Sequence, residues 1–116
     1  MWIMLSNCFL SIVNKDCPKD SLLVRARRPG DIEKVFGRDV KVTRSTDSDY
    51  LYRSIIPMEQ VELALQRAVK NIDYENFKDS VEDHELHLAY MRTWTAMSEL
   101  QHPRPYSTSF TGKLRV

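Results

Sequence analysis

Apolar residues recur with a period of two in the first half of the chain. Residues 2–13 form a mostly apolar run, which predicts a buried first strand. Residues 21–28 alternate and predict a second strand, and the polar residues 14–20 between the two runs predict a hairpin with a long loop. The second strand places Leu22, Val24 and Ala26 on one face and Leu23, Arg25 and Arg27 on the other.

The middle of the chain predicts a short helix between strands. Apolar residues at positions 32, 35 and 36 have helical spacing, and we expect this helix to begin at Asp31 and to be closed by Gly37. Residues 39–44 alternate as a third strand. Residues 45–49 are of the types that hydrogen-bond their own backbone in turns, and residues 50–56 are rich in aromatic and β-branched types and predict a fourth strand.

From residue 58 onwards the apolar period becomes that of a helix. Spacings of three and four from Met58 to Ile72 predict an amphipathic helix. A second helix is expected from about Asp83 to Leu100. Residues 102–116 have two prolines and no helical pattern, which predicts an extended C-terminal tail.

These elements predict an α+β fold. The order is β-β-α-β-β-α-α, a small four-stranded antiparallel sheet with helices packed on one face and the other face partly solvated. A length of 116 residues is typical of one domain, and we assign residues 1–101 to a single α+β domain and residues 102–116 to the tail.

Composition and the N-terminal sequence indicate the cellular compartment of this domain and the state of its cysteines. The apolar fraction of 42% is above that of disordered chains, and two cysteines cannot build a disulfide framework. The apolar start has no basic leader and no small-residue cleavage site, and it is shorter than a membrane span. We therefore expect a cytoplasmic protein without membrane contact, in which Cys8 and Cys17 are free thiols that serve packing.

The net charge of +1 hides an uneven distribution. Residues 15–53 hold 10 basic and 7 acidic side chains, residues 54–101 hold 4 and 9, and residues 102–116 hold 3 and none. The predicted sheet and the tail are therefore basic, and the helical half is acidic.

The basic half offers a candidate binding face for a partner or for nucleic acid. Its members are Arg25, Arg27, Arg28, Lys41, Arg44 and Arg53. Arg25 and Arg27 share a face that Arg53 can join, and Tyr50, Tyr52 or Trp2 can supply stacking surfaces, which is how small sheet modules hold single strands. The alternative is a solvated face whose arginines pair with acidic residues across strands.

The acidic half offers a second candidate face. Its members are Asp73, Glu75, Asp79, Glu82, Asp83 and Glu85. Such a surface can occupy a basic groove on another protein. The alternative is that residues 82, 83 and 85 are acidic because a helix N-terminus favours negative charge.

Catalytic and metal-binding patterns are not found in the sequence. His84 and His87 are three residues apart, one short of the zinc-protease spacing. No glycine-rich phosphate loop and no nucleophile elbow occurs among the 3 glycines. We therefore expect no enzyme, no metal and no cofactor.

Four stretches resemble a family of small uncharacterised bacterial and phage proteins, over most of residues 2–100. The matching stretches are residues 2–13, 23–36, 49–53 and 72–81. The family brings no established activity and no functional residues. In size and architecture the chain is also similar to the single-domain inhibitors of phages and mobile elements, including anti-CRISPR proteins.

Together these observations predict a non-enzymatic binding protein. The first hypothesis is a phage or mobile-element inhibitor of anti-CRISPR type that blocks a nucleic-acid-handling protein complex, such as a CRISPR effector, by direct contact. The second is a small nucleic-acid-binding module that uses the basic sheet face. The third is a housekeeping protein with another role.

Overall fold

The computed structural model describes residues 1–106. Its contacts group the chain into two compact units, the first comprising Met1–Glu75 and the second beginning at Asn76. The assignment of residues 1–101 to one domain stays a prediction. Residues 107–116 of the predicted tail lie outside the described residues.

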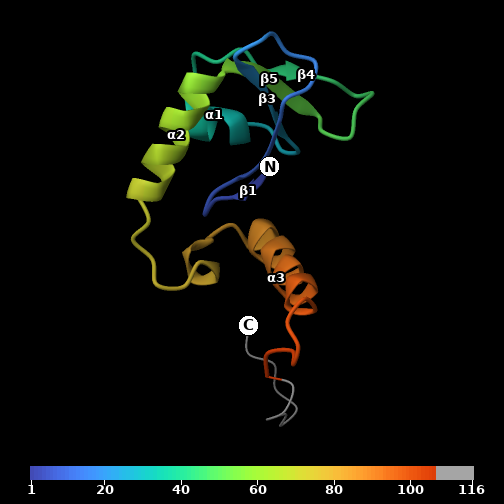
Figure 1. Cartoon of the computed structure of the whole chain (residues 1–116), viewed down its shortest axis with the longest axis vertical. Coiled ribbons are helices and arrows are strands. Elements are labelled where there is room, and N and C mark those ends of the chain that lie inside the picture. Colours follow the sequence, from blue (N-terminus) through green and yellow to red (C-terminus); the bar gives the residue numbers. More distant parts are fainter. Residues whose placement is uncertain (107–116) are drawn as a thin grey trace. The chain divides into compact units, whose positions relative to one another are not determined.

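The first unit contains a five-stranded antiparallel sheet (Figure 1). Its strands are β1 (Trp2–Met4), β2 (Phe9–Val13), β3 (Ser21–Ala26), β4 (Thr43–Arg44) and β5 (Tyr52–Pro57). They are arranged in the order β1-β2-β3-β5-β4. The α+β class and the antiparallel sheet are confirmed, whereas the predicted number of four strands and the predicted element order are wrong.

The additional strand comes from the first apolar run, which divides into β1 and β2. The backbone N–H of Leu5 donates to the carbonyl of Cys8 at 2.9 Å and closes a turn around Ser6 and Asn7. The predicted third strand is also shorter than expected. It spans Thr43–Arg44 only. At Lys41 the backbone carbonyl accepts a hydrogen bond from the Ser54 hydroxyl at 2.8 Å, so it is bound by a side chain and not by the backbone of a neighbouring strand.

Two helices of the first unit pack against the sheet (Figure 1). They are α1 (Asp31–Phe36), which ends at Gly37 with a φ of 90° as its glycine predicts, and α2 (Met58–Lys70). The core they share with the strands contains Cys8, Leu10, Ile12, Val24, Ala26, Ile32, Ile56 and Val61. Because its β3 members are the even-numbered residues, the odd-numbered residues of β3 lie on the opposite face. We call it the open face because the helices pack on the other side, although Leu23 and Ser11 are themselves buried on it.

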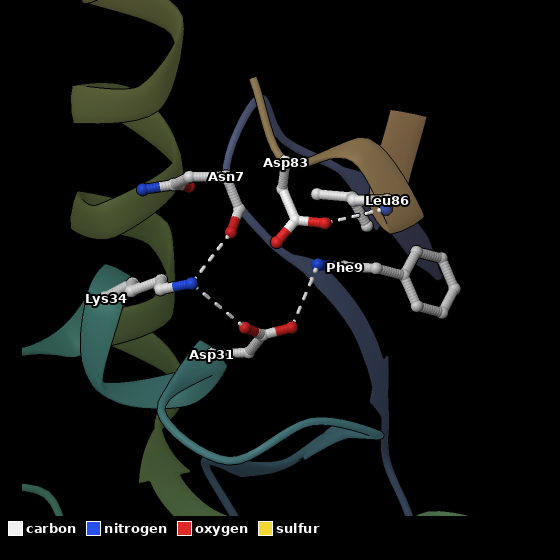
Figure 2. Close-up of polar contacts among 6 residues, drawn as sticks. All are labelled: Asn7, Phe9, Asp31, Lys34, Asp83 and Leu86. Carbon is white, nitrogen blue, oxygen red and sulfur yellow. Dashed lines mark hydrogen bonds and ion pairs between the residues drawn. The ribbon is translucent and has the colours of Figure 1, made fainter. Parts of the chain in front are cut away.

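The second unit contains a short 3₁₀ helix, η1 (Lys78–Ser80), and the helix α3 (His84–Ser98). Asp83 is the N-cap of α3, since its Oδ1 accepts a hydrogen bond from the backbone N–H of Leu86 at 2.8 Å (Figure 2). The rings of Phe77 and Tyr90 stack with centroids 5.4 Å apart and form part of the packing of this unit. Among residues 1–106, every helix is too short or too polar to cross a membrane.

Candidate functional site

One row of side chains crosses the open face of the whole sheet. The register pairs Trp2 with Ser11 and Ser11 with Arg25, and Arg53 lies between Arg25 and Thr43. Residues paired in register share a face, so these five positions form one line from β1 to β4. Four gaps of about 4.8 Å between neighbouring strands make the row roughly 19 Å long.

Tyr50 fixes two of the arginines on this face. Its ring is almost fully buried, and the guanidinium carbons of Arg25 and Arg27 lie 4.5 and 4.2 Å from its centroid. The Arg25 Nη2 donates to the Ser11 hydroxyl at 2.7 Å, and the Arg27 Nη1 donates to the carbonyl of Asp49 at 2.9 Å. These cation–π contacts and hydrogen bonds hold both guanidinium groups in place without neutralising them.

Arg25 and Arg53 form a cross-strand pair of like charge. They lie directly opposite each other on β3 and β5, an arrangement that opposes strand pairing. Among residues 1–106, the Nε atoms of both side chains are buried and have no hydrogen-bond partner. Within residues 1–106 neither guanidinium takes part in an ion pair. The row therefore contains two neighbouring cations with unused donors.

The remaining residues of the predicted basic face separate into two groups. Lys41 lies beside Arg53, where both line a hollow in the sheet surface. Arg44 is paired with Tyr52 and therefore lies on the other face. Arg28 lies beyond the end of β3, in the turn before α1, where its carbonyl accepts a hydrogen bond from the backbone N–H of Asp31 at 3.4 Å. The open face thus brings together residues 25, 27, 41 and 53, but not residues 28 and 44.

Aromatic side chains lie at the β1–β2 end of the same face. Trp2 is 71% exposed, and its ring meets that of Phe9 edge to face with centroids 6.3 Å apart. Tyr52 is paired with Ala26 and faces the helices, so it is no part of the open face. Sequence reasoning did not find Ser11, Phe9 and Thr43, because only the pairing of distant strands places them beside the arginines.

The predicted acidic face is distributed over both units. Asp73 and Glu75 end the first unit, and the other four members belong to the second. All six side chains are exposed. Asp83 has a local role as the N-cap of α3, and Glu85 lies in the first turn, where negative charge is favourable. This geometry fits the helix-terminus interpretation of these two residues.

Among the described residues, the two histidines of α3 belong to no group of three possible metal ligands. The Nδ1 of His87 lies 3.1 Å from the carbonyl of Lys78. Within the part of the chain that the structure describes, no group of three or more His, Cys, Asp or Glu side chains could hold a metal ion.

A buried polar group connects α1 to the β1–β2 turn (Figure 2). Asp31 is 2% exposed, and its Oδ1 pairs with the Lys34 ammonium at 3.4 Å while its Oδ2 accepts from the backbone N–H of Phe9 at 3.5 Å. The Lys34 ammonium also donates to the carbonyl of Asn7 at 3.1 Å. These contacts give Asp31 a structural role, since they attach the start of α1 to the first hairpin.

The two cysteines should differ sharply in reactivity. Burial raises the pKa of the Cys8 thiol from 9.0 to about 12; the neighbouring Asp31 carboxylate also raises it, while the charges of Lys34 and Arg28 lower it. Since the thiolate is the reactive form, we expect a disulfide reagent at about pH 8 to modify Cys17 in the folded protein and Cys8 only after unfolding. Loss of the fast phase in Cys17→Ser would identify the reacting thiol.

The same pKa shift predicts a pH dependence of stability. Below about pH 9 the thiol is protonated in both states, so the stabilisation is fully present. As the pH rises from 9 towards 12, the unfolded state loses this proton more readily, and the free energy of unfolding should fall. Urea titrations of the protein and of Cys8→Ala at several pH values would measure this fall in the free energy of unfolding. Equal pH profiles for the two proteins would contradict the raised pKa of Cys8.

No protein-family model, curated protein or solved structure matches this chain. The resemblance to small bacterial and phage proteins, and to anti-CRISPR inhibitors, therefore stays a prediction from the sequence.

Proposed function

We propose that this protein is a non-catalytic binding protein that holds single-stranded nucleic acid on the open face of its sheet. The like-charged pair of Arg25 and Arg53 is the observation that carries the proposal. Buried donors without acceptors and like charges on facing positions both cost stability. A phosphate group between the two guanidinium groups would accept from both and remove the repulsion.

The aromatic end of the row favours nucleic acid over an acidic protein. Trp2 exposes most of its ring, next to Phe9, in line with the arginines. Bases stack on such rings, while the cations of the same groove follow the sugar–phosphate backbone. A sheet face that offers stacking surfaces and cations in one row supplies both kinds of contact.

The inhibitor hypothesis, in its anti-CRISPR form, stays a second prediction and rests on the sequence resemblance. One version of it used the acidic face, whose residue Asp83 already serves as a helix cap. The other version uses the arginine face against an acidic protein surface. That version shares its residues with the proposal, so a test of the arginine face must include an acidic polypeptide.

Fluorescence anisotropy tests the proposal. The protein is titrated into a labelled single-stranded oligonucleotide of about twelve nucleotides, within the ~4–16 nucleotide footprint of sheet modules. Duplex DNA and polyglutamate serve as competitors. We expect single strands to bind most tightly, and affinity to fall with salt. In Arg53→Gln the log–log salt slope should decrease by about 0.7, the value for one lost phosphate contact.

Arg44→Gln is the matched control, because Arg44 lies on the neighbouring strand but on the other face. It should leave the slope nearly unchanged. Tryptophan fluorescence adds a second readout, since the chain has two tryptophans. Quenching by the oligonucleotide should persist in Trp94→Phe and disappear in Trp2→Phe. Absence of binding at low salt, preference for polyglutamate, or equal effects of both arginine variants would refute the proposal.

A further inference from the structure

A hollow lies on the open face beside the end of the arginine row. Its volume is about 320 Å³, at the lower end of the range of small-molecule pockets. Leu23 and Ile55 give it apolar walls, and Lys41 and Arg53 line it with positive charge. Thr43 and Asp16 add a hydroxyl and a carboxylate. The hollow therefore combines an apolar surface with two cations in a space of one small ligand.

We infer that this hollow is a subsite for one nucleoside phosphate. The inference deepens the proposed function and rests on it, because the hollow continues the row that would hold the strand. The bound group is either the terminal nucleotide of such a strand or a free mononucleotide. Both have a planar base and a phosphate. The apolar lining residues would contact the base, and the cationic lining residues would bind the phosphate.

The phosphate belongs at the cationic side of the hollow. Arg53 lines the hollow with its guanidinium-bearing side chain, and the Lys41 side chain is exposed and takes part in no ion pair within residues 1–106. The Thr43 hydroxyl donates to the carbonyl of Arg53 over a long 3.4 Å, so it can turn to a better acceptor. These three groups supply charge-assisted donors of the kind that phosphate oxygens accept.

The base belongs against the apolar side. Leu23 and Ile55 are register partners on β3 and β5, two positions along from Arg25 and Arg53 and therefore on the same face. Ile55 is 51% exposed, which leaves a hydrophobic surface open beside two cations. The Asp16 carboxylate, which also lines the hollow, would repel a phosphate. In the proposed complex it therefore accepts hydrogen bonds from the sugar hydroxyls or from an amino group of the base.

Isotope-edited NMR titration tests the subsite. The probes are the four ribonucleoside 5′-monophosphates, the corresponding nucleosides and inorganic phosphate. We expect the amide signals of residues 23, 43 and 55 to shift with a monophosphate and saturate near the millimolar range. Nucleosides and inorganic phosphate should each bind at least tenfold more weakly. If inorganic phosphate binds as tightly as the monophosphates, the proposed contact with the base is wrong. If the nucleosides bind as tightly as the monophosphates, the proposed contact with the phosphate is wrong.

Lys41→Ala is the diagnostic variant, because Lys41 accepts the Ser54 hydrogen bond with its backbone carbonyl, which the substitution keeps. Loss of one charged donor should weaken monophosphate binding roughly tenfold. Arg44→Ala, on the other face, should leave it unchanged. Equal effects of the two variants would contradict a site in the hollow.

Oligonucleotides with a terminal phosphate distinguish the two sources of the ligand. If the hollow takes a strand end, a 5′- or 3′-phosphate should tighten binding, and Lys41→Ala should abolish that gain. If only free monophosphates occupy it, terminal phosphorylation has no effect and the monophosphate shifts remain. Strand binding without monophosphate binding, and without a terminal-phosphate effect, refutes the subsite alone. Monophosphate binding without strand binding refutes only the proposed function.

Discussion

Arg53→Glu should stabilise the fold and abolish nucleic-acid binding at the same time. The substitution places a carboxylate directly opposite Arg25 on the neighbouring strand, so a repulsive pair becomes an attractive one. Cross-strand pairs of opposite charge contribute about 0.2–1 kcal/mol, and we expect a gain of this size. The row loses one cation and acquires an anion, which should weaken strand binding at least tenfold, or about 1.4 kcal/mol.

Urea denaturation and anisotropy titration of the same preparations measure the two effects. Arg44→Glu makes the same change in charge on the other face, where no arginine lies opposite. It should leave stability within about 0.5 kcal/mol of the parent protein, as surface substitutions usually do. Arg53→Gln removes the repulsion without adding attraction, so its stability should lie between those of the parent protein and Arg53→Glu.

A gain of stability with a loss of binding is the signature of a functional site. Where function needs a destabilised arrangement, a substitution that relieves it stabilises the fold at the cost of function. A structural arginine pair would give the reverse result, because Arg53→Glu would then remove favourable contacts. Destabilisation by more than about 1 kcal/mol would therefore contradict a repulsive pair, and unchanged affinity would exclude Arg53 from the binding surface.

Periodicity alone predicted much of the local structure. Alternation in residues 21–28 placed Arg25 and Val24 on opposite faces, and the structure confirms it, since Val24 belongs to the core while Arg25 lies in the open row. The 3.6-residue period located α2 to within two residues of its end, at Lys70 instead of Ile72. Helix-capping chemistry explains the start of α3, because the Asp83 side chain binds the first turn.

Long-range pairing is what the sequence could not supply. The strand order places β5 beside β3, and this neighbourhood brings Arg53 opposite Arg25. A shift of one residue in that register would move Arg53 to the other face. The turn at Ser6 and Asn7 was missed for a related reason, since two polar residues within an apolar run also fit exposed positions of a single strand.

Two adjacent isoleucines of β5 should respond very differently to the same truncation. Ile56 is 1% exposed and belongs to the core, whereas Ile55 is 51% exposed on the open face. Ile56→Ala leaves a cavity between sheet and helices and should lower the free energy of unfolding by about 2–5 kcal/mol. Ile55→Ala removes the same three carbon atoms from a half-solvated position, so the loss should stay below about 1 kcal/mol. Similar losses for both variants would contradict the assignment of the helix-covered face.

The Ile56→Ala variant also tests the predicted single domain over residues 1–101. In a Trp2→Phe background the fluorescence of Trp94 reports on the second unit, whereas Ile56 lies in the first. If both units unfold as one cooperative domain, Ile56→Ala shifts the urea midpoint of the Trp94 signal as far as that of the backbone circular dichroism. If the units unfold independently, the Trp94 midpoint stays in place while the sheet signal moves, and the single-domain prediction is wrong.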